Sequence, residues 1–312
     1  MDVLTDVLQT VRVQGACYGR VQAGAPWAVS VRSGAEAKFH VVLSGRCALL
    51  VEGDEPRWLN QGDIVALPHG HAHALHDDPT TPARPLEELM MCRPDRRGLA
   101  IEVGGAGVRT ELVSGRIRFE SPTHNPLLSV LPKVMVLPGE ASRGVQWLEP
   151  TLKFIAWEVA SGKPGAHTVV SRLADVLFIQ IVRGYLAGLP EDASGWLGAL
   201  KDQQMGSALS LIHQNPERDW TVLALAEHVG MSRSAFAARF ARLVGEPPLH
   251  YLTRWRMQKA ASLLREGQAS LSEIAIQVGY DSEAAFSKAF KRAIGSAPGA
   301  YRRRLRDVGE AA

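Results

Sequence analysis

Four histidines with the capacity to bind a metal gather in the N-terminal half of the chain. His71, His73 and His76 are close together, and His40 precedes them. Three imidazoles with an open coordination position suit zinc, copper or iron. Residues at i and i+2 of a strand share a side, which would place His71 beside His73, with His40 on a neighbouring strand. The alternative is that His40 and His73 form hydrogen bonds inside a barrel while His69, His71 and His76 lie in a hydrated loop.

Cysteine offers a second kind of sensor chemistry. The three cysteines, Cys17, Cys47 and Cys92, are too few and too scattered for a disulfide framework, which favours a reducing cytoplasm. Cys17 and Cys92 fall in loop-like stretches, and the arginines just after Cys92 would favour a thiolate there. These two cysteines are therefore candidates for a redox sensor.

Short strands are expected to position these side chains. Apolar, β-branched stretches at 29–32, 41–43 and 47–52 alternate with turn residues such as Ser33-Gly34 and Ser44-Gly45, a pattern typical of a small barrel or sandwich over residues 1–120. Residues 77–108 are rich in proline, arginine and glycine and predict a long loop. One more strand is expected at 110–113 or 116–119.

The hydrophobic period changes near residue 145. Apolar residues at i, i+4 and i+8 predict a helix over 145–159 and a second over 166–187. These helices either close the barrel or form a dimer interface. Residues 1–188 are thus predicted as one sensor or dimerisation domain, followed by a linker at 189–204.

An internal repeat occupies the C-terminal third. Residues 225–230 resemble 274–279 at an offset of 49, and Phe236, Phe240 and Gly245 match Phe286, Phe290 and Gly295 at an offset of 50. Each copy has a short apolar helix, a glycine suited to a tight turn, a capping serine and a helix with phenylalanines at i and i+4. This is the helix-turn-helix pattern, whose second helix enters the major groove of DNA. A helix over 249–265, about 25 Å long, joins the copies.

Residues 205–306 resemble the DNA-binding domain of AraC/XylS-type transcription regulators. The resemblance is carried by several motifs: Trp220 to Ala226, Met231 to Phe236, Arg239-Phe240, Pro247 to Leu252, Trp255 to Met257, Val278 to Phe286, and Phe290 to Arg292 with Pro298 to Arg302. Helical spacing leaves one set of residues pointing outward, at positions where that family contacts bases and phosphates. This set is Arg233, Ser234, Ala237, Ala238, Arg242, Glu283, Ser287, Lys288, Lys291 and Arg292.

Residues 1–120 resemble the cupin sensor domain found in front of many such regulators. Gly62, Pro68, Gly70 and His73 have the spacing of the second cupin motif. The first motif is half present, because Gly34 and His40 fit whereas Val42 stands where a second histidine is expected. A metal on the histidines is therefore disfavoured. Many cupin regulators also carry Cys-Gly where this chain has Ser114-Gly115, which weakens a redox analogy.

Charge is distributed unevenly along the 312 residues. Residues 1–200 carry 19 lysines and arginines against 21 aspartates and glutamates, whereas residues 201–312 carry 16 against 11. The excess of positive charge in the C-terminal third indicates a nucleic-acid partner. No apolar run approaches a membrane span, and the acidic N-terminus does not resemble a secretory signal.

The expected fold is therefore α+β, with a cupin-like barrel and trailing helices before an all-α domain of two helix-turn-helix units joined by a long helix. The expected function is sequence-specific DNA binding in the cytoplasm to regulate transcription, with RNA polymerase as a partner, a small ligand or stress as the signal and activation as the commoner outcome in the resembling family. No catalytic residue or required cofactor is expected. The alternative is a metal- or redox-responsive cupin protein, even an enzyme, with a DNA-binding appendage.

Overall fold

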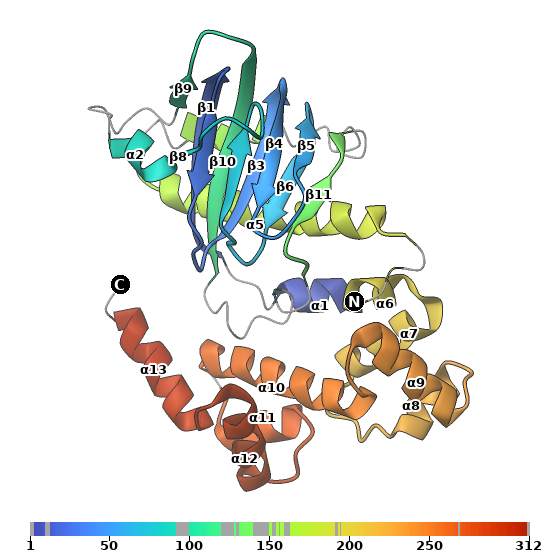
Figure 1. The fold of residues 1–312 in the computed structure, drawn as a ribbon. Coiled ribbons are helices and arrows are strands. Elements are labelled where there is room, and N and C mark those ends of the chain that lie inside the picture. Colours follow the sequence, from blue (N-terminus) through green and yellow to red (C-terminus); the bar gives the residue numbers. More distant parts are fainter. Residues whose placement is uncertain are drawn as a thin grey trace. The chain divides into compact units, whose positions relative to one another are not determined.

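The computed structural model describes residues 3–9, 13–91, 100–119, 128, 131–139, 150–151, 154–155, 157–158, 163–190, 193, 195–267 and 269–310. Contacts along the chain define two compact units. Residues 12–122 and 131–188 form the sensor unit, which holds the sheets, and residues 1–11, 123–130 and 189–312 form the helical unit (Figure 1).

Two sheets make up the sensor unit. One has the strand order β11-β6-β3-β10-β1-β9 and the other has the order β5-β4-β7-β2-β8. The strands are β1 (Val13–Gly24), β2 (Ala28–Val31), β3 (Ala37–Ser44), β4 (Arg46–Val51), β5 (Arg57–Asn60), β6 (Ile64–Leu67), β7 (His73–His76), β8 (Arg84–Pro85), β9 (Ala100–Gly104), β10 (Arg109–Phe119) and β11 (Met135–Leu137). The predicted barrel of short strands is confirmed, and it extends beyond residue 120 through β11.

The core of the sensor unit combines side chains of both sheets. Val42 and Leu112 come from the larger sheet and Leu49 and Leu75 from the smaller one. Because strand side chains alternate between faces, the other face of the larger sheet also needs cover. Helix α5 (Ala166–Gly188) supplies it, packing on β1 and β11 (Figure 1). Its Phe178 ring meets Phe119 of β10 edge-on, with ring centroids 4.9 Å apart.

Three expectations for this unit need correction or remain untested. The predicted loop over 77–108 is wrong, because it contains β8, helix α2 (Leu86–Met91) and β9. Leu86, Leu89, Ile101 and Val103 of these elements pack against the core. The alternative strands at 110–113 and 116–119 are one continuous strand, β10. The helix predicted over 145–159 falls mostly outside the described residues.

The helical unit consists of short helices around one long helix. They are α1 (Val3–Gln9), α6 (Trp196–Lys201), α7 (Gln203–Gln214), α8 (Val222–His228), α9 (Arg233–Val244), α10 (Pro248–Glu266), α11 (Leu271–Gln277), α12 (Glu283–Ile294) and α13 (Pro298–Glu310). Helix α1 packs against α7 and buries Val3 and Val7. The predicted linker at 189–204 is instead partly helical. It contains α6, which is held in the unit by the buried side chains of Trp196 and Leu197.

The repeat has the local structure that its sequence predicts. Ser232 Oγ accepts a hydrogen bond from the backbone N–H of Ala235, and Ser282 Oγ accepts one from Ala285, so each serine caps its helix. The turn glycines Gly230 and Gly279 have φ of 68° and 76°. The phenylalanines of both copies are fully buried. None of the described helices is long and apolar enough to cross a bilayer.

Candidate DNA-reading helices and ligand pocket

Helix α9 is the second helix of the first helix-turn-helix unit. Phe236 and Phe240 point inward, which leaves the opposite face to the solvent. Arg233, Ser234, Ala238 and Arg242 are exposed on that face and Ala237 is partly exposed, as the spacing predicts. The middle of this face is therefore small and apolar, with a guanidinium near each end.

Helix α12 is its counterpart in the second unit, built on Phe286 and Phe290. Its outward residues are Glu283, Ser287, Lys288, Lys291 and Arg292; Ser287 is partly exposed and the others are exposed. Glu283 lies in the first turn, where a carboxylate interacts favourably with the helix dipole. Of the three cations, Lys288 lies at the middle of the helix and Lys291 and Arg292 lie in its last turn.

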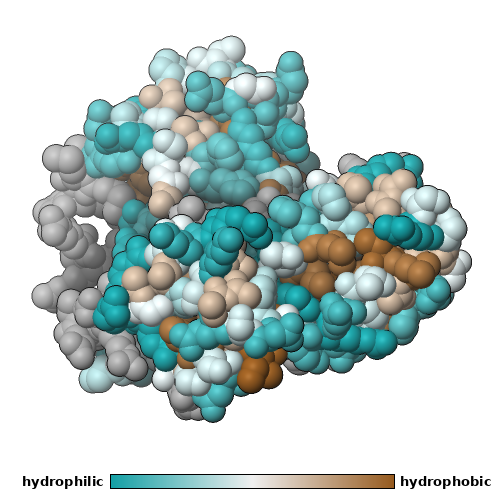
Figure 2. Space-filling model, turned by 90° about the horizontal axis from the view of Figure 1, so that it is seen from below, coloured by the Kyte–Doolittle hydropathy of each residue, from teal (hydrophilic) through white to brown (hydrophobic). Residues whose placement is uncertain are grey.

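The cations on these two faces are free to bind an anion. Among the described residues, none of the five forms an ion pair with a carboxylate. They are Arg233, Arg242, Lys288, Lys291 and Arg292. Figure 2 views the molecule from the side of the helices α8 to α12, where the surface is mostly hydrophilic with smaller apolar patches. Exposed, unpaired cations on a helix that fits the major groove are the groups that contact phosphates in protein–DNA complexes.

Two other arginines of the helical unit hold the helices in place instead. Arg239 of α9 forms an ion pair with Asp202 and donates a hydrogen bond to Gln204 Oε1 at 2.8 Å. Arg256 of α10 donates hydrogen bonds to the carbonyl oxygens of Pro216 and Arg218. These two arginines could not be distinguished from surface cations by sequence, because their partners lie 35 or more positions away.

A buried polar chain joins α6, α7 and α10. Trp196 Nε1–H donates to the Tyr251 hydroxyl, and that hydroxyl donates to His213 Nε2, each over 2.8 Å. His213 therefore carries its proton on Nδ1, which faces Asp6 Oδ2 of α1 at 3.8 Å. Burial lowers the pKa of His213 to about 3, with Arg254 acting in the same sense. The histidine is neutral at pH 7.

In the sensor unit, His40 and His73 are joined by a hydrogen bond whose direction is set by the other partner of His73. His73 Nδ1–H donates a hydrogen bond to the carbonyl of His71 at 3.0 Å, so its Nε2 accepts a hydrogen bond from His40 Nε2–H at 2.7 Å. Ser114 Oγ then donates to His40 Nδ1 at 2.8 Å. Burial lowers the pKa of His73 to about 4 and that of His40 well below its usual value. Both rings are neutral and fully hydrogen-bonded at pH 7.

The four candidate metal ligands do not converge on one point. His71 precedes β7 and makes an edge-on ring contact with His69. His76 Nδ1–H donates a separate hydrogen bond to the carbonyl of Thr81 at 3.0 Å. Within the described part of the chain, no three histidine, cysteine, aspartate or glutamate side chains are grouped to hold a metal. Two imidazoles hydrogen-bonded to each other are too few donors for the metal site of a cupin.

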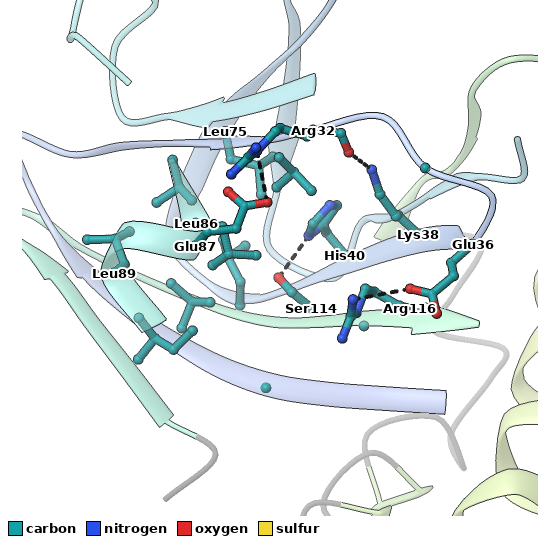
Figure 3. Close-up of a pocket in the computed structure, with 18 of the residues that line it drawn as sticks. Arg32, Glu36, Lys38, His40, Leu75, Leu86, Glu87, Leu89, Ser114 and Arg116 are labelled. Atoms are coloured by element: carbon teal, nitrogen blue, oxygen red, sulfur yellow. Dashed lines mark hydrogen bonds and ion pairs between the residues drawn. The ribbon is translucent and has the colours of Figure 1, made fainter. Parts of the chain in front are cut away.

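A pocket of about 560 Å³ opens beside this histidine pair. Its apolar wall includes Val21, Leu75 and Leu112, and helix α2 contributes Leu86 and Leu89. Figure 3 shows the leucines of α2 on one side of the space and a polar group with Lys38, Glu36 and Arg116 on the other. A concave, mainly apolar space with a few polar groups is the usual form of a small-molecule site.

Comparison with known proteins accounts for both units. A family model described as a cupin matches residues 2–187, and one described as a helix-turn-helix domain matches residues 225–304. A protein of Streptomyces lividans, named a putative AraC-like transcription regulator, is 37% identical over 97% of this chain and 98% of its own length. The chain belongs to the AraC family of transcription regulators.

Further relatives share the full length of this AraC-family protein. The HTH-type transcriptional regulator AlkR of Acinetobacter baylyi is 33% identical over 97% of this chain and 99% of its own. The activator RclR of Escherichia coli, named as specific for RCS, is 28% identical over 99% of both chains. Among solved structures, the DNA-binding domain of AdpA bound to a target DNA is 33% identical and covers 34% of this chain and 95% of its own, with a TM-score of 0.32. The predicted DNA-binding regulator is confirmed.

The cysteines of this AraC-family protein are only partly described. Cys47 is buried in the core of the sensor unit, and burial raises the pKa of its thiol to about 12. Strand β1 pairs Cys17 with Arg116 of β10. Cys92 lies outside the described residues. The redox hypothesis for Cys17 and Cys92 therefore stays a prediction.

Proposed function

We propose that this regulator binds DNA by placing α9 and α12 in two successive major-groove segments, with α10 setting their separation. The observation that carries the proposal is the set of five exposed, unpaired cations on the outward faces of these helices. Lys288, Lys291, Arg292 and Arg242 contact phosphates. Bases are contacted from the first turns, where Arg233 suits guanine and Glu283 suits cytosine.

Alanine substitution at Lys288 tests this interface. A duplex selected from a random library by the full-length protein serves as probe, and fluorescence anisotropy gives the affinity. We expect Lys288→Ala to weaken binding about tenfold, because one phosphate contact is lost. Arg57→Ala removes one cation from the exposed end of β5 in the sensor unit and is expected to leave the affinity unchanged. Equal effects of both variants would contradict the interface.

The sensor unit is proposed to control this DNA binding through a small ligand in the pocket beside His40. Binding would shift the protein between DNA-competent and incompetent populations. The support is the preformed space with its apolar wall, since AraC-type sensing requires a place for an effector. We further propose that the pocket performs no catalysis and needs no resident metal, because its two histidines already satisfy each other. Stoichiometric metal in the purified protein by elemental analysis would contradict this.

Self-association and contact with RNA polymerase complete the proposal. Val169 and Val176 are a helical heptad apart on α5 and remain exposed, as expected if a second copy covers them. Analytical ultracentrifugation is expected to give a dimer that Val176→Asp dissociates.

The relative RclR is named an activator, and we propose that this protein likewise activates transcription. In vitro transcription from a selected site upstream of a promoter, with purified RNA polymerase, tests this activation.

A further inference from the structure

The polar side of the sensor pocket is organised by two paired strands. Alternation along β3 places Lys38 and His40 on the same face as the core residue Val42. The register of β3 with β10 puts Arg116 opposite Lys38 and Ser114 opposite His40. These side chains therefore share one end of the space, as Figure 3 shows.

Most of the polar groups at this end already have partners. His40 and Ser114 are hydrogen-bonded to each other and carry no charge. Glu36 forms ion pairs with Arg116 at 3.2 Å and with Arg118 at 2.7 Å. The remaining carboxylate and guanidinium of the rim form an ion pair of their own, between Glu87 and Arg32.

Lys38 is the exception. Its residue is only 5% exposed, whereas the three arginines around the pocket are largely exposed to water. Its ammonium donates hydrogen bonds to two carbonyl oxygens, those of Arg32 and Gly70. An ammonium has three N–H donors, and no carboxylate of the described residues lies within ion-pair distance of this one. Glu87 and Glu36 stabilise its charge only from beyond ion-pair distance, and burial, together with the nearby Arg116 guanidinium, still lowers the pKa of Lys38. An anion in direct contact with this ammonium would therefore be favourable.

The opposite side of the pocket excludes a purely polar ligand. Val21, Leu75 and Leu112 rise from three strands, and Leu86 and Leu89 of α2 cover them. A ligand that fills the pocket thus meets hydrocarbon over most of its surface and one buried ammonium at its polar end. The complementary molecule has an apolar body and a single negative charge.

We propose that this pocket binds an organic monocarboxylate with an apolar body, whose carboxylate pairs with the ammonium of Lys38 while its body lies against the leucines of α2. The assignment deepens the proposed effector control by naming the class of ligand. Binding itself is measured without DNA, so the two proposals fail separately.

Octanoate and its neutral counterpart octanamide are suitable probes for the full-length protein. Isothermal titration calorimetry is expected to show octanoate binding about tenfold more tightly than octanamide, since only octanoate gains a charge-assisted contact. Lys38→Met preserves the side-chain length and should abolish the difference. Lys133→Met is the matched control, because Lys133 belongs to the sensor unit but pairs with Asp54 outside the pocket lining.

A second variant keeps the test decisive if Lys38→Met does not fold. Leu89→Trp enlarges a partly buried side chain of α2 that lines the pocket, and it should weaken both probes together. Equal affinities for octanoate and octanamide in the wild type, unaltered octanoate binding in Lys38→Met, or no binding of either probe would each overturn the assignment. Octanoate binding that leaves DNA affinity unchanged would instead contradict effector control.

Discussion

The two recognition helices share one construction but differ in their outward chemistry. Both begin at a capping serine, bury two phenylalanines and end at a left-handed glycine, Gly245 or Gly295. At equivalent outward positions, however, α9 has Arg233 where α12 has Glu283, and Ala238 where α12 has Lys288. The part that the two units share builds the fold, whereas the part in which they differ would, in the proposed complex, contact different halves of a DNA site.

The inward positions differ as well. The equivalent of Arg239 in the second unit is Ala289, which is buried in the core around α10. The first unit uses its arginine to reach Asp202 and Gln204 at the start of α7. The first recognition helix is thus attached to helices before the repeat, and the second is held by packing alone at this position.

Loss of a core phenylalanine tests whether the two units are equally important to folding. Phe240→Ala and Phe290→Ala each remove a fully buried ring and should destabilise the protein by about 3 to 5 kcal/mol. Urea unfolding followed by tryptophan fluorescence measures the change. A loss below about 1 kcal/mol at one position only would show that this unit does not have the tightly packed core described here.

The turn glycines should separate the two units further. A Cβ at Gly230 meets no atom within 4 Å, so Gly230→Ala costs only the left-handed backbone, about 1 to 2 kcal/mol. A Cβ at Gly279 would lie 2.6 Å from Arg256 and 2.7 Å from the carbonyl of Glu217. We expect Gly279→Ala to lose a further 1 to 3 kcal/mol, roughly, in urea unfolding. Equal losses of unfolding free energy in the two variants would show that the turn at Gly279 is no more tightly packed than the turn at Gly230.

A smaller, pH-dependent effect is expected from His213, which belongs to the helices before the repeat. Its pKa of about 3 lies below that of the unfolded chain, so the unfolded state binds more protons as the pH falls below about 6.5. Arg254 and Lys259 lower the pKa of His213 in the same sense as burial, and the carboxylate of Asp6 lies 3.8 Å from its Nδ1. Stability is therefore lost as the pH falls, by about 1 to 2 kcal/mol between pH 7 and pH 5.

The comparison that isolates this effect uses His213→Gln across the same pH range. Urea unfolding of this variant should lose less stability than the wild type on acidification. His228→Gln serves as control, because His228 is exposed on α8 and forms no ion pair with a carboxylate of the described residues. This variant is expected to follow the wild type. Parallel curves for the wild type and His213→Gln would show that His213 is not held neutral by the fold.

Local signals explain which features were predictable from sequence. The caps Ser232 and Ser282, the glycine turns and the long central helix α10 depend on neighbours a few residues away, and the prediction of that helix is correct to within one residue at each end. The outward faces of α9 and α12 followed from helical period. These features could be predicted because the residues that determine them are close in sequence.

Features that depend on distant partners were missed or mistaken. The attachment of Arg239 to Asp202, the packing of α1 against α7 and the register that brings Ser114 to His40 all join distant segments. The histidines illustrate the same limit. Spacing suggested one cluster, but His71 lies before β7 rather than in it, so only His40 and His73 meet.

The proposed mode of DNA binding depends on unpaired cations of α9 and α12 that contact phosphates. The salt dependence of affinity for a selected duplex tests it most directly, measured by anisotropy for the wild type and for the triple variant Lys288→Ala, Lys291→Ala and Arg292→Ala. The logarithm of the binding constant should fall steeply with the logarithm of salt concentration, and the slope of the variant should be shallower by about 2 to 3. A wild-type affinity that does not respond to salt, or identical slopes for the two proteins, would contradict the account.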